Sequence, residues 1–167
     1  MALPTVSRCV DWVREHPAEL AAVDSPIEPA PDGHGLREEE RTLRTQICGI
    51  RWTPSQKGLE ENRAYYGWIL HGFELYAELE MVGIETVECF PTASWTRWLG
   101  PRGSQTRAAW TRGGLERLGL AGIPARTNQD VRDALAAAMT ARLHTSGRTD
   151  DAFGAIVVPQ DGSLGEG

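Results

Sequence analysis

Residues 20–26 have the sequence LAAVDSP, in which a short apolar run ends at an aspartate and a Ser-Pro turn. A run of this length, bounded by turn residues, is typical of a buried β-strand. The segment IETVECFP at 84–91 predicts a second strand, and AIVVP at 155–159 predicts a brief third one. Because helical patterns separate these segments, we expect an α/β domain with parallel strands joined by right-handed crossovers.

Apolar residues at helical spacing predict the helices that lie between and around these strands. The expected helices span residues 5–16, 36–48, 60–80, 94–99, 105–120 and 127–147, with a loop at 49–58. The last helix has the strongest signals, because Thr127 or Asn128 can cap it and alanines fill its body. So many helices present more apolar surface than two or three strands can cover. The sequence therefore predicts fewer β-strands than the helices need to bury their apolar faces.

Composition and charge narrow the class of protein. The chain has 167 residues and a net charge of −6, so no global basic field attracts it to nucleic acid or to an anionic membrane. Its three cysteines form no CxxC pair, which favours reduced thiols in the cytoplasm. We find no signal peptide or membrane-spanning run, and so we expect no membrane partner. A single domain over residues 1–159 and a flexible tail over 160–167 are predicted.

Asp24 is the first candidate for a functional residue. It stands where the strand at residues 20–24 ends, and ligands bind at this edge of open α/β sheets. An aspartate before Ser-Pro is equally typical of a residue that begins a turn. The position alone leaves both interpretations open.

Asp130 and Asp133 lie three residues apart in the first turns of the last helix. Residues at this spacing share a helix face, with Cβ atoms about 5–6 Å apart, so one cation could contact both. Acids in a first helical turn also interact favourably with the helix dipole and need no function. Asp133 lies deeper, beside an alanine-rich face, where a carboxylate is costly unless it is paired or bound to metal. We therefore favour a function for Asp133 and leave Asp130 open.

Glu88 and two arginine clusters complete the candidates. On the residues alone, Glu88 is interpreted as a solvent-facing residue of the second strand.

Two clusters of arginines are interleaved with tryptophans. Such arginines could bind a phosphate backbone, and the tryptophans could stack on bases. A solvated, salt-bridged helix surface explains the first cluster equally well, and tryptophans at helical positions are more typical of a core. The residues concerned are Arg37, Arg41, Arg44 and Arg51, then Arg97, Arg102, Arg107 and Arg112, with Trp52, Trp95, Trp98 and Trp110.

Several of these motifs together resemble a known family. In chain order they are AAVDSPIEP at 21–29, REEERTLR at 37–44, GIRWTPS at 49–55, VECFPTASW at 87–95 and TNQDVRDALAAAMTARL at 127–143. They are similar to domain-of-unknown-function family 429, whose members are described as predicted ribonuclease H-like nucleases. The resemblance lies in the order and spacing of these motifs together, and it covers most of the chain, from about residue 4 to residue 159.

The resemblance implies a ribonuclease H-like mixed sheet flanked by helices. Asp24, Asp133 and Asp130 would be the catalytic acids that hold Mg²⁺ or Mn²⁺, and Arg37 and Glu88 would take part in substrate binding. The implied activity is two-metal hydrolysis of a phosphodiester, with nucleic acid as the substrate or partner.

Ribonuclease H-like folds begin with a three-stranded meander that supplies one catalytic acid, whereas this chain opens on the helix that follows it. The resemblance therefore implies an N-terminally truncated fold of doubtful activity. The alternative is a non-catalytic module that binds nucleic acid or protein on the same fold. An unpaired edge at the strand of residues 20–24 would also favour self-association.

Overall fold

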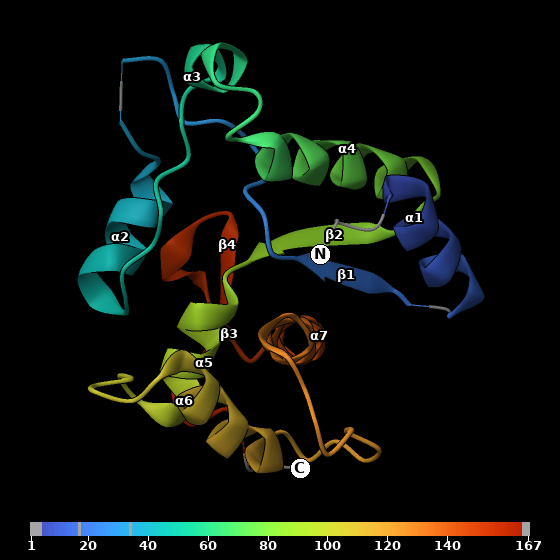
Figure 1. Ribbon diagram of the computed structural model, residues 1–167, viewed down its shortest axis with the longest axis vertical. Helices are drawn as coiled ribbons and strands as arrows, with labels where there is room; N and C mark the ends of the chain where they lie inside the picture. The colour runs from blue at the N-terminus through green and yellow to red at the C-terminus, as the bar shows by residue number, and fades with distance from the viewer. Residues whose placement is uncertain (1–4, 17, 34, 165–167) are drawn as a thin grey trace.

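A four-stranded mixed sheet forms the centre of the computed structural model, which describes residues 5–16, 18–33 and 35–164 (Figure 1). The strand order is β1-β2-β4-β3, with β2 parallel to both neighbours and β3 antiparallel to β4. An α/β domain with a mixed sheet and flanking helices is therefore confirmed, and only β3 lies outside the sequence-based expectation. The strands are β1 (Leu20–Val23), β2 (Glu85–Cys89), β3 (Thr149–Asp150) and β4 (Ile156–Pro159).

Strands β1 and β2 end at the same edge of the sheet. They are parallel, and their register pairs Ala22 with Val87 and Val23 with Glu88. Asp24 follows β1 directly, so it lies at the carboxyl edge, beside the end of β2. The predicted parallel pairing of these two strands is confirmed, and it places Asp24 where ligand-binding residues gather in such sheets.

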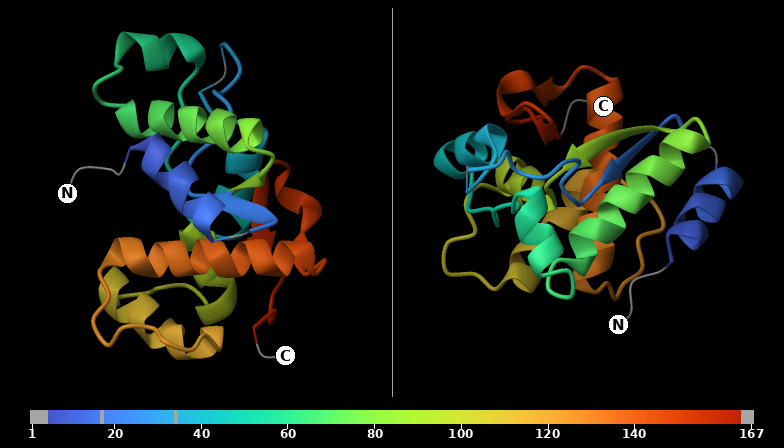
Figure 2. Two further views of the ribbon diagram at one scale, coloured as in Figure 1. Left: turned by 90° about the vertical axis from the view of Figure 1, so that its right-hand side faces the viewer. Right: turned by 90° about the horizontal axis from the view of Figure 1, so that it is seen from above.

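Different helices cover the two faces of the sheet (Figures 1 and 2). One face carries α1 (Val6–Glu15) and α4 (Gly67–Met81), and the other carries α7 (Gln129–Thr145). Val10 of α1 and Tyr76 of α4 belong to one buried cluster with Val23 of β1. Val6, Val10 and Val13 of α1 recur every three or four positions, and this spacing places all three in the same cluster, whereas Trp12 is exposed.

Helix α7 contacts both β1 and β4. Ala136 and Ala137 of this helix are buried, and Ala136 packs in a cluster with Trp95 and Trp98. Asn128 caps the helix, because its side-chain oxygen accepts the backbone N–H of Val131 at 2.8 Å. Of the two caps that the sequence allows, the structure therefore uses Asn128.

A tryptophan-rich core holds the helices below α7. Here α5 (Pro91–Leu99) and α6 (Arg107–Gly114) pack on α7 and bury Trp95, Trp98 and Trp110. The interpretation of these three residues as core is confirmed. On the other side of the molecule, Leu43 of α2 (Glu38–Gln46) packs with Phe153 and Ile156 beside β4.

Two of the expected helices are shorter than their patterns predicted. The helix expected at 60–80 is interrupted by turns over residues 62–66, and α3 (Gln56–Glu61) occupies part of the expected loop. Ser55 starts α3 early, because its side chain accepts the backbone N–H of Gly58. The helix expected at 105–120 ends its α-helical part at Gly114 and continues as a 3₁₀ turn (Leu115–Leu118).

Residues 160–164 of the expected tail pack on the domain, and residues 165–167 lie outside the described part of the chain. Ser163 is buried and its hydroxyl accepts a hydrogen bond from the Trp98 indole at 3.2 Å.

Within the described ranges, none of the helices combines the length and the apolar character that a membrane span requires.

Candidate functional site

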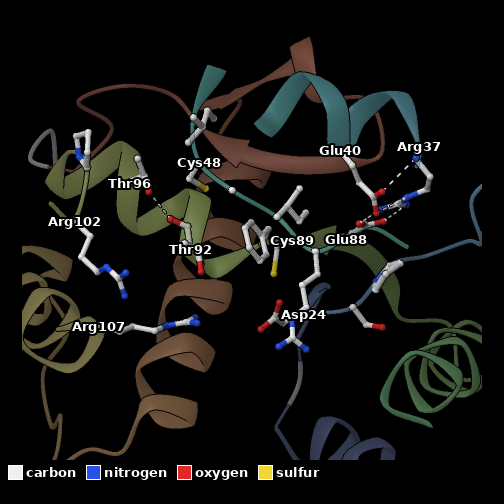
Figure 3. Close-up of a pocket in the computed structure, with 18 of the residues that line it drawn as sticks. Asp24, Arg37, Glu40, Cys48, Glu88, Cys89, Thr92, Thr96, Arg102 and Arg107 are labelled. Atoms are coloured by element: carbon white, nitrogen blue, oxygen red, sulfur yellow. Dashed lines mark hydrogen bonds and ion pairs between the residues drawn. The ribbon is translucent and has the colours of Figure 1, made fainter. Parts of the chain in front are cut away.

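A pocket of about 820 Å³ opens at the carboxyl edge of β1 and β2. Its floor carries Asp24 and Glu88, and its walls come from α2, α4, α5, the start of α6 and the loop after α2. Figure 3 shows Asp24 facing the centre of this pocket, with Arg102 and Arg107 reaching in from the opposite side. The volume lies within the range of about 300–1,000 Å³ that is usual for small-ligand sites.

Asp24 is accessible from the pocket, yet protein atoms surround it on most sides. The pKa of Asp24 is raised to about 7, chiefly by desolvation and then by the charge of Asp133, whereas the charge of Arg107 opposes the shift. A carboxyl group with a pKa near neutrality exists in both protonation states there. Asp24 is therefore suited to accept or to donate a proton.

Asp133 stands beside the pocket, and its charge is already partly neutralised. Arg107 Nη2 lies 3.0 Å from Asp133 Oδ2, and Gln129 Nε2 donates to Asp133 Oδ1 at 2.9 Å. Asp133 does not line the pocket, but it lies near enough for its charge to act on Asp24. Asp130 is exposed in the first turn of α7 and does not line the pocket.

Arg37 and Glu88 form a buried ion pair, with 2% and 4% of their side chains exposed. Arg37 donates from both terminal nitrogens to the two Glu88 oxygens, with 2.7 Å between Arg37 Nη1 and Glu88 Oε2. Glu88 Oε2 also accepts the backbone N–H of Ile27 at 2.9 Å. The interpretation of Glu88 as solvent-facing is therefore wrong, because the loop between β1 and α2 folds back over the end of β2 and covers it.

Glu40 extends this network to the loop that follows α2. One Glu40 oxygen accepts from Arg37 Nε at 3.2 Å, and the carboxylate also accepts the backbone N–H and the hydroxyl of Thr53. The network ties α2 to the loop that carries Arg51. The sequence shows the three-residue spacing of Arg37 and Glu40, but no signal in it points to Thr53, which approaches only in the folded chain.

The two arginine clusters of the sequence meet at this pocket. Arg51 comes from the first cluster and Arg102 and Arg107 from the second, and all three line the pocket and are exposed. In the described part of the chain, no carboxylate forms an ion pair with Arg51 or Arg102. Trp68, at the start of α4, also lines the pocket, although the sequence patterns did not single it out.

The carboxylates do not fit the two-metal centre that the family resemblance implies. Across the described ranges, no group of three or more His, Cys, Asp or Glu side chains is placed to hold a metal ion. Glu88 is committed to Arg37, and Arg107 already stands against Asp133. Asp24 and Asp133 remain as two interacting carboxylates, which is a smaller donor set than a two-metal site requires.

The pocket also contains two thiols, and neither has the properties of a nucleophile. Burial raises the pKa of Cys48 and, more strongly, that of Cys89, which is fully enclosed. Both groups therefore stay protonated near neutral pH, where only a thiolate would attack a substrate. The chemistry open to the pocket is thus the binding of anions by arginines and proton transfer by Asp24.

Comparison of the chain with protein-family models, with curated proteins and with solved structures finds no match.

Proposed function

We propose that this protein binds a phosphate ester of the nucleic-acid type in the pocket at the carboxyl edge of β1 and β2. One observation carries the proposal: Arg51 from one segment, and Arg102 and Arg107 from another that is distant in the sequence, line a single concave site. Arg51 and Arg102 have no carboxylate partner within the described residues, so their charges are available to a ligand. Guanidinium groups bind phosphate oxygens through several hydrogen bonds at once.

Because the chain is acidic, only a local positive region can attract the proposed anionic ligand. With a net charge of −6, the molecule as a whole repels nucleic acid, so binding depends on the local field of the pocket. The arginine pair Arg102 and Arg107 supplies that field at the side opposite the buried Arg37–Glu88 pair. A non-catalytic nucleic-acid-binding module on a ribonuclease H-like fold is the form of the proposal that these contacts support best.

The test is binding of a fluorescent single-stranded dT oligonucleotide of about ten nucleotides, followed by anisotropy at several salt concentrations. The double variant Arg102→Gln/Arg107→Gln should bind more weakly than the parent. Its slope of log K against log salt should be shallower by about 0.7 for each lost phosphate contact. Arg112→Gln is the matched control, because Arg112 is exposed on α6 and does not line the pocket. If the double variant and the control bind equally well, the pocket is not the phosphate site.

A second candidate, metal-assisted phosphodiester hydrolysis, is favoured by the interaction between Asp24 and Asp133. A single Mg²⁺ or Mn²⁺ shared by these carboxylates would relieve their repulsion, and Mg²⁺ is commonly held by one or two carboxylates together with water and phosphate. Metal ligands must be deprotonated, so Mn²⁺ should raise the melting temperature more at about pH 8 than at about pH 5.

Two variants separate this metal site from weak surface binding. Asp24→Asn and Asp133→Asn should each abolish the stabilisation by Mn²⁺, whereas Asp11→Asn, at an exposed position of α1, should leave it intact. A melting temperature of the parent that Mn²⁺ does not change would remove the hydrolase candidate and leave the binding proposal standing.

A further inference from the structure

Trp68 differs from the tryptophans that form the core. Trp95, Trp98 and Trp110 are buried between α5, α6 and α7, whereas Trp68 is 39% exposed at the start of α4 and lines the pocket. A large aromatic side chain that stays partly exposed in a concave site is available to a ligand.

The wall formed by α5 and α6 brings guanidinium and hydroxyl groups to the pocket, beside the buried Trp110. Arg102 and Arg107 reach into the pocket from this wall, and Thr92 and Thr96 of α5 lie beside them (Figure 3). The Thr96 hydroxyl donates to the backbone oxygen of Thr92 at 2.8 Å. The Thr92 hydroxyl forms no hydrogen bond with any other described residue, so it can donate to a phosphate oxygen beside the two guanidinium groups.

The size and shape of the site restrict which part of a nucleic acid can enter. A pocket of about 820 Å³ accommodates a small ligand and not the body of a double helix. In a duplex the faces of each base are covered by its neighbours, so an aromatic side chain can stack only on a base that has left the helix or was never paired.

We propose that the pocket takes a single unpaired nucleotide unit, with its base stacked on Trp68 and its phosphate held by Arg102, Arg107 and the Thr92 hydroxyl. This inference rests on the proposed binding of a phosphate ester and adds to it a strand preference and a base-binding residue. It makes the protein selective for single strands, for strand ends or for bases that have left a duplex.

The experiment measures the affinities of the parent and of Trp68→Ala for four probes, by equilibrium dialysis at one salt concentration. The probes are a dT oligonucleotide, the same strand in a blunt duplex, an abasic strand of the same length and inorganic phosphate. The parent should bind the dT strand more tightly than the duplex and the abasic strand. Trp68→Ala should weaken binding of the dT strand by about fivefold or more, as expected for the loss of one stacked base.

Two further variants distinguish stacking from a general loss of structure. Trp68→Phe should restore most of the affinity, because phenylalanine also offers a flat π-face. Trp12→Ala is the matched control, since Trp12 is 59% exposed on α1 and does not line the pocket. Binding of the abasic strand should be the same for the parent and for Trp68→Ala, because that probe keeps the phosphates and lacks the base.

The outcomes separate this inference from the proposed function. If the duplex binds as tightly as the single strand, or if Trp68→Ala changes no affinity, the nucleotide inference is wrong. The proposed function would stand in that case provided that Arg102→Gln/Arg107→Gln still weakens binding. If neither oligonucleotides nor inorganic phosphate bind the parent, both proposals fail together.

Discussion

At the scale of single residues, the buried ion pair of Arg37 and Glu88 holds the floor of the pocket in place. Burial raises the pKa of Glu88, and the hydrogen bonds from Arg37 oppose that shift. Each partner compensates the desolvation of the other, so the pair is tolerable only when it is complete. The network joins three separate segments of the chain, namely α2, the end of β2 and the loop that contains Ile27.

Arg37→Met should therefore lower the free energy of unfolding by about 3–5 kcal/mol, because it leaves Glu88 charged and without its partner. Urea denaturation measures this change. Arg41→Met is the matched control, since Arg41 forms an exposed pair with Glu38 on the same helix, and it should cost no more than about 1 kcal/mol. Equal losses for the two variants would show that the buried pair does not support the fold.

The shifted carboxyl group of Asp24 makes the stability of the protein depend on pH. Its pKa is raised from 3.8 to about 7 in the folded state, mainly by desolvation. Between these two values the folded state binds more protons than the unfolded state, so the free energy of unfolding falls as the pH rises. Below this window the group is neutral in both states, and above it the penalty is complete.

Asp24→Asn should consequently melt at the same temperature as the parent near about pH 4 and at a higher temperature near about pH 8. Thermal melts of both proteins at the two pH values measure the difference. Asp11→Asn, on the exposed side of α1, should track the parent at both pH values. A parent protein that is as stable as Asp24→Asn near about pH 8 would contradict the raised pKa.

At the scale of elements, a close contact between α4 and the turn after β1 positions Asp24. A Cβ atom at Gly72 would lie 2.0 Å from Ser25 Oγ and 2.5 Å from Ser25 Cβ, so only glycine allows this approach. The Tyr76 hydroxyl, one turn further along α4, donates to the Ser25 carbonyl at 2.8 Å. Helix α4 therefore holds Ser25, the residue directly after Asp24, through both its side chain and its carbonyl.

Gly72→Ala should force α4 and this turn apart, and the overpacking should cost about 1–3 kcal/mol in the free energy of unfolding. Gly67→Ala is a control within the same helix, because a Cβ atom there would meet nothing within 4 Å. It should be neutral or slightly stabilising, since alanine favours the helix over glycine. Chemical denaturation of the two variants distinguishes a local clash from a general effect on α4.

At the scale of the whole molecule, the order of the strands leaves β1 at the edge of the described sheet. An edge strand presents backbone N–H and C=O groups that can pair with another chain. Self-association through this edge is therefore our proposal for the contact between copies of the protein. It requires no change in the pocket, which lies at the carboxyl ends of the strands.

Size-exclusion chromatography should show an apparent mass that increases with protein concentration. Hydrogen exchange at residues 20–23 should slow over the same range, because a second chain would protect backbone groups of β1. Residues 85–89 of β2 serve as the internal control, since β2 is already paired on both sides and its exchange should not depend on concentration. A monomer at every concentration, with unchanged exchange at β1, would refute association through the sheet edge.

The sequence by itself determined the elements whose signals are local. Alternating or continuous apolar runs predicted β1, β2 and β4, and a cap at Thr127 or Asn128 with the alanine-rich body predicted α7. It also placed Asp24 at a strand end, because a strand boundary is written in the residues that form the turn. The break between α3 and α4 escaped prediction, since apolar spacing continues across residues 62–66 and gives no sign of the turns there.

Only the tertiary structure decided which side chains meet. It buried Glu88 against Arg37, joined Glu40 to Thr53 and brought Arg51 to the same pocket as Arg102 and Arg107. Each of these contacts joins residues that are distant in the sequence, and no local pattern records them. The charge and solvation of a side chain depend on such neighbours, so the raised pKa of Asp24 is a property of the fold and not of the sequence around it.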